Sequence, residues 1–316
     1  MNKYILTLII IILAIFTTYS TYNYYETVEN TVFIGYLPSN HHAALFVAHE
    51  KNLFEKEGLN VQLVPFRNGE DLLRAAEYNQ IDMGYCGITP VMMALDENEP
   101  IKVVAAVNQE GSGIVVSNDI RNVNDFKGET VAIPREGSIQ DVLLKYYLLK
   151  NNINPDEVNI TELEVPVMEV NLENQFINAY VAWEPYVSLA NVSNENVSRT
   201  FIYSGDIIKD HPCCVVIATD KFIESKPDSL RKVLKVHVNA TEYVNDHTEE
   251  VAQILSAKLG TDVEVEKEGL KHVEFIAVPS QEFMEETLII HGIQKELGYV
   301  KNDITLEEIF DLRYLP

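Results

Sequence analysis

The sequence has little positive charge and few cysteines. Its 316 residues contain 24 lysines and arginines against 48 aspartates and glutamates, which gives a formal net charge of −24 at pH 7. A nucleic-acid-binding protein needs clustered lysine and arginine to neutralise phosphates, so this composition argues against a nucleic-acid partner. The only cysteines are Cys86, Cys213 and Cys214. They are too few for a disulfide framework, although a bridge from Cys86 to either of the others is left open.

The motifs of several enzyme classes are also missing. The sequence contains no Gly-x-Ser-x-Gly elbow, no phosphate-binding Gly-x-x-x-x-Gly-Lys loop, no Gly-x-Gly-x-x-Gly after a strand and no His-Glu-x-x-His. The short stretch Gly111–Gly113 does not suffice to hold a nucleotide. We therefore expect a protein without catalytic residues and without a cofactor.

The first 30 residues predict export. Lys3 precedes the apolar run Tyr4–Phe16, and small hydroxyl residues follow it. This order is typical of a signal peptide, whereas a spanning helix needs roughly twenty apolar residues. If the tyrosines from Tyr19 to Tyr25 are included, the segment is long enough for a membrane anchor. Both interpretations place the rest of the chain outside the cytoplasm, either secreted or tethered to the outer face of the membrane.

The remaining chain has the pattern of a two-lobed α/β protein. Hydrophobic residues make up 47% of the sequence, and single cores stop growing at about 250–300 residues. From residue 31 to about residue 220, strand patterns alternate with helical spacing, as in the helix predicted over 42–57. This alternation favours parallel strands joined by crossover helices. From about residue 228 the pattern is helical to the end, with helices predicted over 229–245, 249–259 and 281–297.

Short blocks spread over residues 32–220 resemble the sulfonate/nitrate/taurine-type solute-binding proteins of ABC importers. They occur in the order found in that family, and they are Gly35–Pro38, Ala44–Ala48, Asn52–Val61, Ile81–Gly84, Gly87–Pro90, Pro100–Val104, Gly111–Val116, Asp125–Gly128, Val131–Pro134, Gly137–Ser138 and Ala182–Pro185. Each block is weak alone, but the ordered set behind an export signal is specific. The helical segment from about residue 228 to the end contains few of the family's motifs.

The resemblance implies a type II periplasmic-binding-protein fold in which two segments cross between the lobes. We expect lobe one at about 31–115 plus 212–316 and lobe two at about 116–211. The family also includes binders of a pyrimidine precursor of thiamine, of riboflavin-type ligands and of bicarbonate, so the resemblance defines the type of protein better than its cargo. It further implies a monomer that works with a membrane permease.

Polar residues follow the predicted strands, where open α/β sheets bind their ligands. The candidate ligand-binding residues are Ser39, Asn40, His41, His42, Tyr85, Cys86, Gly87, Thr89, Glu110, Ser112, Gly137, Ser138, Trp183, Glu184 and His211. Thr89 and Ser138 lie at predicted helix starts, whose free N–H groups suit an anion. Ordinary helix capping explains a hydroxyl at those two positions equally well.

Several of these residues have alternative roles. His41 and His42 are suited to donating hydrogen bonds to an anion or stacking on a heterocycle, although one of them could cap the helix and the other lie exposed. Trp183 is either an aromatic wall for the ligand or part of the core, and Glu184 either selects an amine or braces the hinge. A zinc-like set of His41, His211, Cys86 and Cys213 lacks the spacing of a closed metal site, so we expect no metal.

The expected function is the capture of a small solute by hinge closure. A small organic anion such as an alkanesulfonate or taurine ranks first as cargo, followed by a pyrimidine-type thiamine precursor and then by nitrate or bicarbonate. A thiamine-pyrimidine synthase-like enzyme on the same fold is the alternative class, but it would be cytoplasmic. A surface-attached sensor domain is a further alternative.

Overall fold

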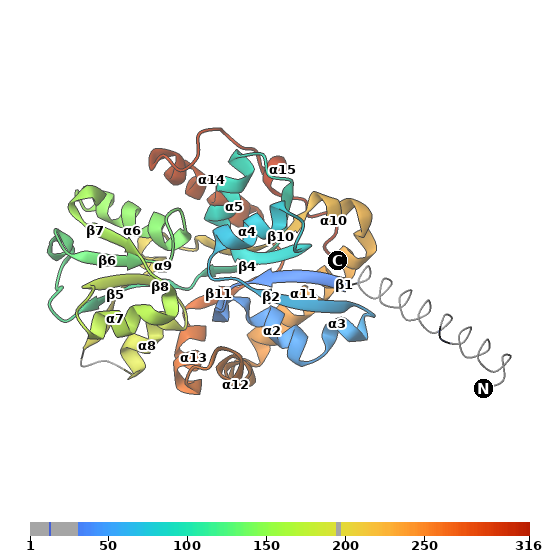
Figure 1. Cartoon of the computed structure of the whole chain (residues 1–316), viewed down its shortest axis with the longest axis horizontal. Helices are drawn as coiled ribbons and strands as arrows, with labels where there is room; N and C mark the ends of the chain where they lie inside the picture. Colours follow the sequence, from blue (N-terminus) through green and yellow to red (C-terminus); the bar gives the residue numbers. More distant parts are fainter. Residues whose placement is uncertain (1–12, 14–30, 194–196) are drawn as a thin grey trace, which may run out of the picture.

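The computed structural model describes residue 13, residues 31–193 and residues 197–316. The predicted export signal or anchor, apart from residue 13, lies outside these residues. Over the part that is described, no helix is both long and apolar enough to cross a membrane. The chain forms two lobes, each built on its own β-sheet, which lie side by side in Figure 1. The two-lobed α/β arrangement predicted from the sequence is therefore confirmed.

The first lobe contains a six-stranded sheet in the order β11-β4-β10-β3-β1-β2. Its strands are β1 (Thr31–Tyr36), β2 (Asn60–Pro65), β3 (Met83–Gly87), β4 (Ile101–Glu110), β10 (Pro212–Thr219) and β11 (Val273–Phe275). The second lobe contains a five-stranded sheet in the order β7-β6-β8-β5-β9. Its strands are β5 (Ser112–Ser117), β6 (Thr130–Ile133), β7 (Asn159–Glu162), β8 (Ala179–Trp183) and β9 (Ser198–Tyr203).

The prediction of parallel pairing holds for only part of each sheet. Strand β1 pairs parallel with β2 and β3, and β6 pairs parallel with β7 and β8. In contrast, β10 runs antiparallel to β3 and β4, and β5 runs antiparallel to β8 and β9. The reason is the double crossing of the chain. The chain leaves the first sheet at the end of β4. It re-enters through β10 at the same end of the strands, so β10 must run in the opposite direction.

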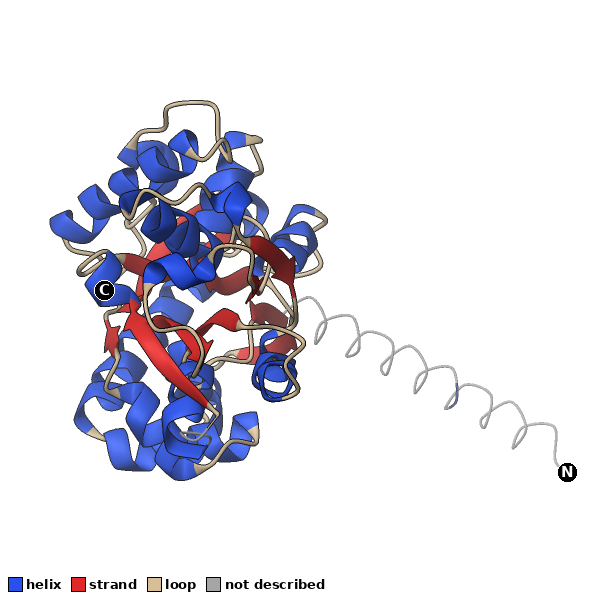
Figure 2. Ribbon diagram, turned by 90° about the vertical axis from the view of Figure 1, so that its left-hand side faces the viewer, coloured by secondary structure: helices blue, strands red, loops and turns tan. Residues whose placement is uncertain are grey.

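Helices cover both faces of the sheets (Figure 2). The helices are α2 (Ala43–Glu50), α3 (Leu53–Lys56), α4 (Gly69–Glu77), α5 (Ile88–Asp96), α6 (Ile139–Lys150), α7 (Met168–Glu173), α8 (Tyr186–Ser193), α9 (Ser204–Ile207), α10 (Asp220–Ser225), α11 (Pro227–Asp246), α12 (Thr248–Leu259), α13 (Val263–Leu270), α14 (Gln281–Glu296) and α15 (Leu306–Ile309). Short 3-10 turns are η1 (Asn40–His42), η2 (Val123–Phe126), η3 (Pro155–Glu157) and η4 (Val165–Val167).

Two details of the predicted helices are wrong. The single helix expected over 42–57 is divided into α2 and α3, because Asn52 adopts a left-handed conformation with φ 52°. The tail is largely helical, as predicted, but it also supplies β11 at the edge of the first sheet, where Val273 pairs with Glu110. A strand of three residues is too short to give a periodic signal in the sequence.

Strand β10 forms the centre of the first lobe and positions both cysteines of the Cys213–Cys214 pair. Residues Val215 and Ile217 pack in one hydrophobic cluster, while Val216 and Ala218 pack in another, as the alternation of a strand requires. Cys213 and Cys214 break this alternation, because both belong to the second of these clusters. The pairing of β10 with β4 has register shifts at this point. Such a bulge allows two adjacent side chains to face the same way.

Candidate functional site

A cavity of about 300 Å³ lies between the two lobes. The first lobe contributes residues that follow β1 and β3 and residues of α4 and α5. The second lobe contributes the loop before α6, the first turn of α6 and the end of β8. Six of the residues predicted from strand ends line this cavity, and they are Ser39, His41, His42, Gly87, Ser138 and Trp183.

The lining has a buried part and a charged part. We call the buried polar, aromatic and sulfur-containing members the floor of the cleft, and they are Ser39, His41, His42, Gln140, Trp183 and Cys214, none more than 7% exposed. We call the charged members the rim, and they are Glu70, Arg74, Glu77, Glu97, Glu99, Arg135 and Glu136. The floor carries no arginine, lysine or carboxylate.

His42 is held in the floor as a neutral imidazole. Its Nδ1 lies 3.0 Å from the carbonyl oxygen of Leu37, and its ring meets Tyr85 edge-on with centroids 5.7 Å apart. Burial, together with the neighbouring His41, lowers the pKa of His42 to about 3. Its Nε2 is buried and has no hydrogen-bond partner in the protein. A buried polar atom of this kind costs free energy unless something bonds to it, so Nε2 is available to a ligand.

Hydrogen bonds join the lobes around the floor. The indole Nε1 of Trp183 donates to the carbonyl oxygen of Pro38 at 3.3 Å, and the hydroxyl of Ser39 donates to the carbonyl oxygen of Glu184 at 3.1 Å. The hydrogen bond to Pro38 therefore fixes the orientation of the Trp183 ring, and 7% of the residue's surface remains accessible. These contacts connect the end of β8 to the turn that follows β1.

The N-terminus of α6 reaches the cavity but is already satisfied by the chain itself. Ser138 caps the helix by accepting from the backbone N–H of Asp141, and the Asp141 carboxylate accepts from the backbone N–H of Gly137 at 2.8 Å. Gln140 donates from Nε2 to the Ser112 hydroxyl at 2.9 Å. A carboxylate in the first turn offsets the positive end of the helix dipole. This helix start is consequently less suited to an anionic ligand than its sequence indicates.

His41 contacts both adjacent cysteines. Its Nδ1 lies 3.5 Å from Sγ of Cys213 and 3.6 Å from Sγ of Cys214, while its Nε2 lies 2.7 Å from the carbonyl oxygen of Gly111. Burial lowers the pKa of His41, but the interactions with Cys213 and Gly111 outweigh burial, so the net pKa lies above its usual value. The hydrogen bond from Cys214 and the proximity of His41 hold the pKa of Cys213 well below its ordinary value despite burial.

The cysteines are not arranged as either of the possibilities raised by the sequence, a disulfide from Cys86 or a metal site that includes Cys86. All three cysteines are free thiols. Cys86 packs in the hydrophobic cluster that contains Val215, on the opposite face of the sheet from Cys213 and Cys214. The zinc-like set of His41, His211, Cys86 and Cys213 is therefore not assembled. His41 and Cys213 do come together, but with Cys214 as the third member.

Other predicted residues lie beside the cavity without lining it. Asn40, Tyr85, Cys86, Thr89, Gly137, Glu184 and His211 are buried and do not belong to the lining. Tyr85 points its hydroxyl toward His237 Nδ1 at 3.1 Å. Glu110 and Ser112 line a second cavity of about 260 Å³ at the crossing between the lobes. Their positions at strand ends place all of these residues near the cleft, but the position of a strand end does not determine which side chains face the opening.

The helices α4 and α5 supply lining residues that the strand-end argument missed. Their contributions recur every three or four positions, as Glu70, Leu73, Arg74 and Glu77 on α4 and as Pro90, Met93 and Ala94 on α5, with Glu97 directly after that helix. This spacing is the signature of one helix face. The helical spacing alone could have identified these faces of α4 and α5, but only once the position of the second lobe was known.

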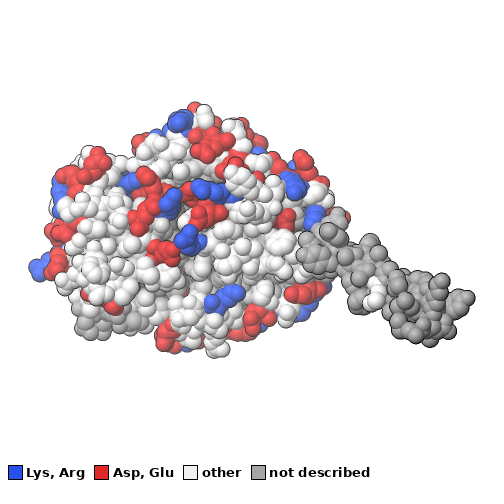
Figure 3. All heavy atoms as spheres, viewed as in Figure 1, with Lys and Arg blue, Asp and Glu red and all other residues white. Residues whose placement is uncertain are grey.

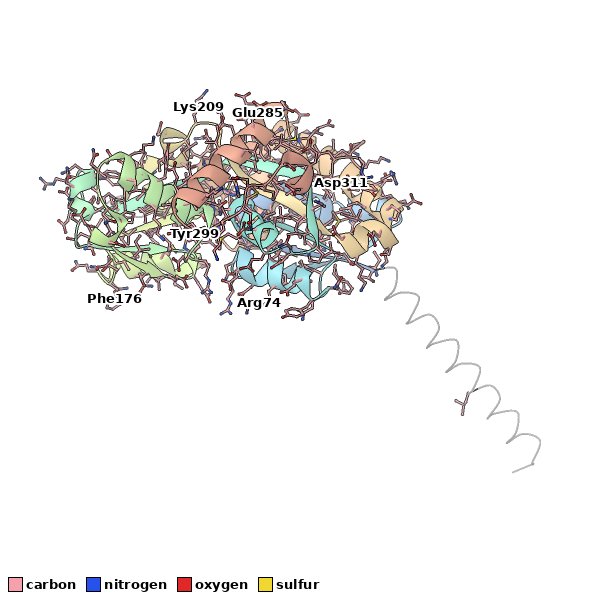
Figure 4. All side chains as sticks on the ribbon, turned by 90° about the horizontal axis from the view of Figure 1, so that it is seen from above. Arg74, Phe176, Lys209, Glu285, Tyr299 and Asp311 are labelled. Atoms are coloured by element: carbon pink, nitrogen blue, oxygen red, sulfur yellow. The ribbon has the colours of Figure 1, made fainter. Side chains whose placement is uncertain are left out.

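Ion pairs close the rim across the two lobes. Arg135 of the second lobe contacts Glu70 of α4 at 2.6 Å and Glu162 at 2.8 Å, and Arg67 contacts Glu164 at 3.2 Å. Acidic and basic side chains gather along the middle of the face shown in Figure 3. On the other side, Tyr299 follows α14 and hydrogen-bonds to Asp141 and Lys145 of α6. Figure 4 shows Tyr299 over the junction of the lobes and Arg74 at the edge of the first lobe.

The fold is that of a type II periplasmic binding protein. The ligand-binding component of an ABC-type import system from Staphylococcus aureus, solved with zinc bound, superimposes with a TM-score of 0.80 at 21% identity, over 90% of this chain and 97% of that one. The periplasmic aliphatic sulphonate binding protein of Escherichia coli superimposes with a TM-score of 0.75 at 20% identity, over 89% and 92%. The fold predicted from the sequence resemblance is thus confirmed.

The chain belongs to the NMT1-like family, which it matches over residues 27–256. A putative aliphatic sulfonates-binding protein of Bacillus subtilis is 26% identical over 239 residues, 73% of this chain and 70% of that protein. A nitrate/nitrite binding protein of Nostoc is 22% identical over 249 residues, 71% of this chain and 56% of that protein's length. The chain is a solute-binding protein of the ABC-import type, as predicted.

Proposed function

We propose that this protein is the extracytoplasmic component of an ABC importer and that its cargo is a small uncharged ring, such as a substituted pyrimidine. The lobes would close on the ring and present the closed form to a membrane permease. Binding would favour the closed form because the ligand contacts both lobes only in that form. The family relationship supports the transport role, and the chemistry of the cleft supports the class of cargo.

The observation that carries the proposal is the absence of an unpaired cation in the cavity lining. The lining, all of which is described, contains two basic side chains, Arg74 and Arg135, against five glutamates. Both arginines are paired with Glu70, at 2.8 Å and 2.6 Å. An anion that enters this cavity would meet mostly acidic side chains and would have to compete for each arginine.

The floor is well suited to a flat ring with polar edges. Trp183 offers an aromatic surface, and ring–aromatic contacts add about 0.5–1.5 kcal/mol beyond simple burial. His42 Nε2 has no partner, and the amide of Gln140 lies in the same lining. A substituted pyrimidine carries ring nitrogens and amino groups that can bond to such donors and acceptors.

A small sulfonate is the second candidate. The curated relative from Bacillus subtilis and the solved Escherichia coli protein are both described as binding aliphatic sulfonates. The first turn of α6 also reaches the cavity through Ser138 and Gln140. The sequence ranked this cargo first. The paired arginines and Asp141 at the start of α6 lead us to rank it below the uncharged ring.

A ligand screen of the purified full chain tests the proposal. Calorimetry and thermal unfolding would be measured with hydroxymethylpyrimidine, an alkanesulfonate, taurine, nitrate and bicarbonate. We expect saturable binding of the pyrimidine alone. The variant His42→Phe keeps the ring against Tyr85 but loses both ring nitrogens, Nδ1 facing Leu37 and Nε2. Pyrimidine affinity should fall by about 10-fold, equivalent to about 1.4 kcal/mol.

His237→Phe is the matched control, because His237 is an equally buried imidazole that contacts Tyr85 from outside the cavity. Its affinity for the pyrimidine should match that of the original protein. Saturable binding of a sulfonate without binding of the pyrimidine would overturn the proposed cargo but leave the transport role. Failure of every candidate would overturn the assignment of the cleft as a site for this class of solute.

A further inference from the structure

Among the described residues, one group of potential metal ligands has the geometry of a metal site. It consists of His41, Cys213 and Cys214, whose ligand atoms lie within 4.8 Å of one another, and all three residues are buried. His41 comes from the turn after β1, and the cysteines begin β10. The group therefore brings together two segments of the first lobe that are 172 residues apart in the sequence.

The bulge in β10 explains how two neighbouring cysteines join one group. Successive side chains of a regular strand point to opposite faces, which would send one thiol away from His41. The register shifts on both sides of Cys214 remove this alternation. As a result, both Sγ atoms face His41 and lie 3.8 Å apart.

The distances within the group match three corners of a tetrahedral zinc site. Bonds of about 2.3 Å to sulfur and 2.0–2.1 Å to nitrogen place tetrahedral ligands about 3.8 Å apart for two sulfurs and about 3.6 Å apart for sulfur and nitrogen. The observed separations are 3.8 Å between the two Sγ atoms and 3.5 and 3.6 Å from them to His41 Nδ1. The three atoms are thus already spaced as ligands of one cation.

His41 is oriented as a metal-binding histidine. Its Nε2 lies 2.7 Å from the Gly111 carbonyl oxygen and donates its proton there, so in the neutral imidazole Nδ1 carries the lone pair that faces the thiols. Metal-binding histidines are commonly fixed in this way by a carbonyl on the other ring nitrogen. Gly111 allows this close approach, because it has φ +83° and a Cβ there would lie 2.4 Å from His41 Nε2.

We propose that His41, Cys213 and Cys214 bind one Zn²⁺ ion through Nδ1 and the two Sγ atoms. His41 and Cys214 also line the cleft, so the fourth position is left to water or to a donor atom of a solute. Each proton held by a thiol or by His41 Nδ1 is released to solvent when the bond to the metal forms, and no electron is transferred. Three protein ligands with an open fourth position are typical of zinc sites that take part in ligand binding.

Titration of the purified, reduced and chelator-treated full chain with Co²⁺ and Zn²⁺ tests the site without any organic cargo. We expect one Co²⁺ per chain, with the intense thiolate-to-metal absorption of a tetrahedral site, and its displacement by Zn²⁺. In Cys213→Ser and Cys214→Ser, the affinity for Zn²⁺ should fall by more than about 100-fold, which exceeds the loss expected for an outer-shell partner alone.

Cys86→Ser is the matched control, because Cys86 is an equally buried thiol that faces the other side of the sheet. It should keep the cobalt spectrum and the original affinity. Thermal unfolding of each metal-free variant would identify any that fails to fold, and His41→Gln would provide an independent loss of one ligand. The proposal is overturned if the reduced protein gives no thiolate absorption, or if the absorption persists when both Cys213 and Cys214 are replaced. Because no cargo is present, either outcome leaves the ligand screen unaffected.

Discussion

The floor and the rim of the cleft are neighbouring surfaces with opposite physical character. The floor residues are at most 7% exposed, and hydrogen bonds from the two lobes fix several of them. The rim residues that form ion pairs, Glu70, Arg74, Arg135 and Glu136, keep 41–69% of their side chains exposed. Removal of a polar side chain from the floor leaves its buried partner unsatisfied, whereas water takes the place of a side chain removed from the rim. Substitutions should therefore have large effects in the floor and small effects in the rim.

The largest effect should follow from crowding the floor at the crossing between the lobes. Gly111→Ala puts a Cβ 2.4 Å from His41 Nε2 and 2.8 Å from Val273 in a residue with φ +83°. We expect the free energy of unfolding, measured by urea titration, to fall by about 3–4 kcal/mol, as the sum of backbone strain and overpacking.

Gly128→Ala separates these two contributions. Gly128 has φ +80° but no atom within 4 Å of an added Cβ, so only the backbone strain applies. Its cost should be about 1 kcal/mol. If the two variants lost equal stability, the packing of Gly111 against His41 would contribute nothing, and the floor would not be as rigid as we describe.

A buried carboxyl beneath the floor should control the pH dependence of stability. Burial raises the pKa of Glu184 to about 7, although the backbone N–H and hydroxyl of Ser188 oppose this change. In the unfolded chain the pKa of a glutamate is about 4.3, so the folded state binds the proton more tightly. This contribution to stability is fully present below about pH 4.3 and is lost as the pH rises toward about 7.

The variant Glu184→Gln should remove most of that loss. Between about pH 4.5 and pH 7.5, the fall in the free energy of unfolding should become smaller by about 2–3 kcal/mol. Glu266, whose pKa burial also raises to about 7, would account for part of the fall that remains. Glu157→Gln is the control, because that exposed glutamate has a pKa lowered by Lys127 and should not alter stability in this range. An unchanged pH profile in Glu184→Gln would show that Glu184 is ionised in the folded protein.

Loss of the aromatic wall should weaken binding of the ring. For Trp183→Ala we expect about 30-fold lower affinity for hydroxymethylpyrimidine by calorimetry, equivalent to about 2 kcal/mol. Trp183→Phe keeps a ring and should lose less. Phe176→Ala, which changes an aromatic side chain 73% exposed on the second lobe, should leave affinity as it was. Equal affinity in Trp183→Ala and the original protein would remove Trp183 from the site.

The floor also shows how far sequence reasoning could go. Ser39, His41, His42 and Trp183 were predicted, because the ends of strands in an α/β sheet meet at one edge and the strands were recognisable locally. Gln140 was not, although it lies only two residues beyond the predicted Ser138. Strand ends identify the edge of a sheet, but the rotation of a helix about its axis decides which side chain of its first turn faces the cavity.

The features that the sequence did not predict depend on contacts between distant segments. The antiparallel direction of β10 follows from the second crossing between the lobes, and the bulge at Cys213 and Cys214 follows from its pairing with β4. A strand signal gives neither direction nor register, so it could not show that both cysteines lie beside His41. The rim was missed for the same reason, since the partner of Arg135 on α4 is 65 residues away in the chain.

The smallest effect should come from the rim. Arg135→Ala removes the ion pairs with Glu70 and Glu162, whose side chains are 41% exposed. Because exposed pairs contribute about 0–1 kcal/mol, we expect affinity to fall by no more than about 3-fold at physiological salt, and the difference to disappear near 1 M salt. Arg74→Ala removes a pair with the same Glu70 but within α4, so it does not affect closure of the lobes and should leave affinity unchanged. A loss of 30-fold or more in Arg135→Ala that persists at high salt would mean that Arg135 contacts the cargo directly, and an anionic ligand would then replace the uncharged ring as the better candidate.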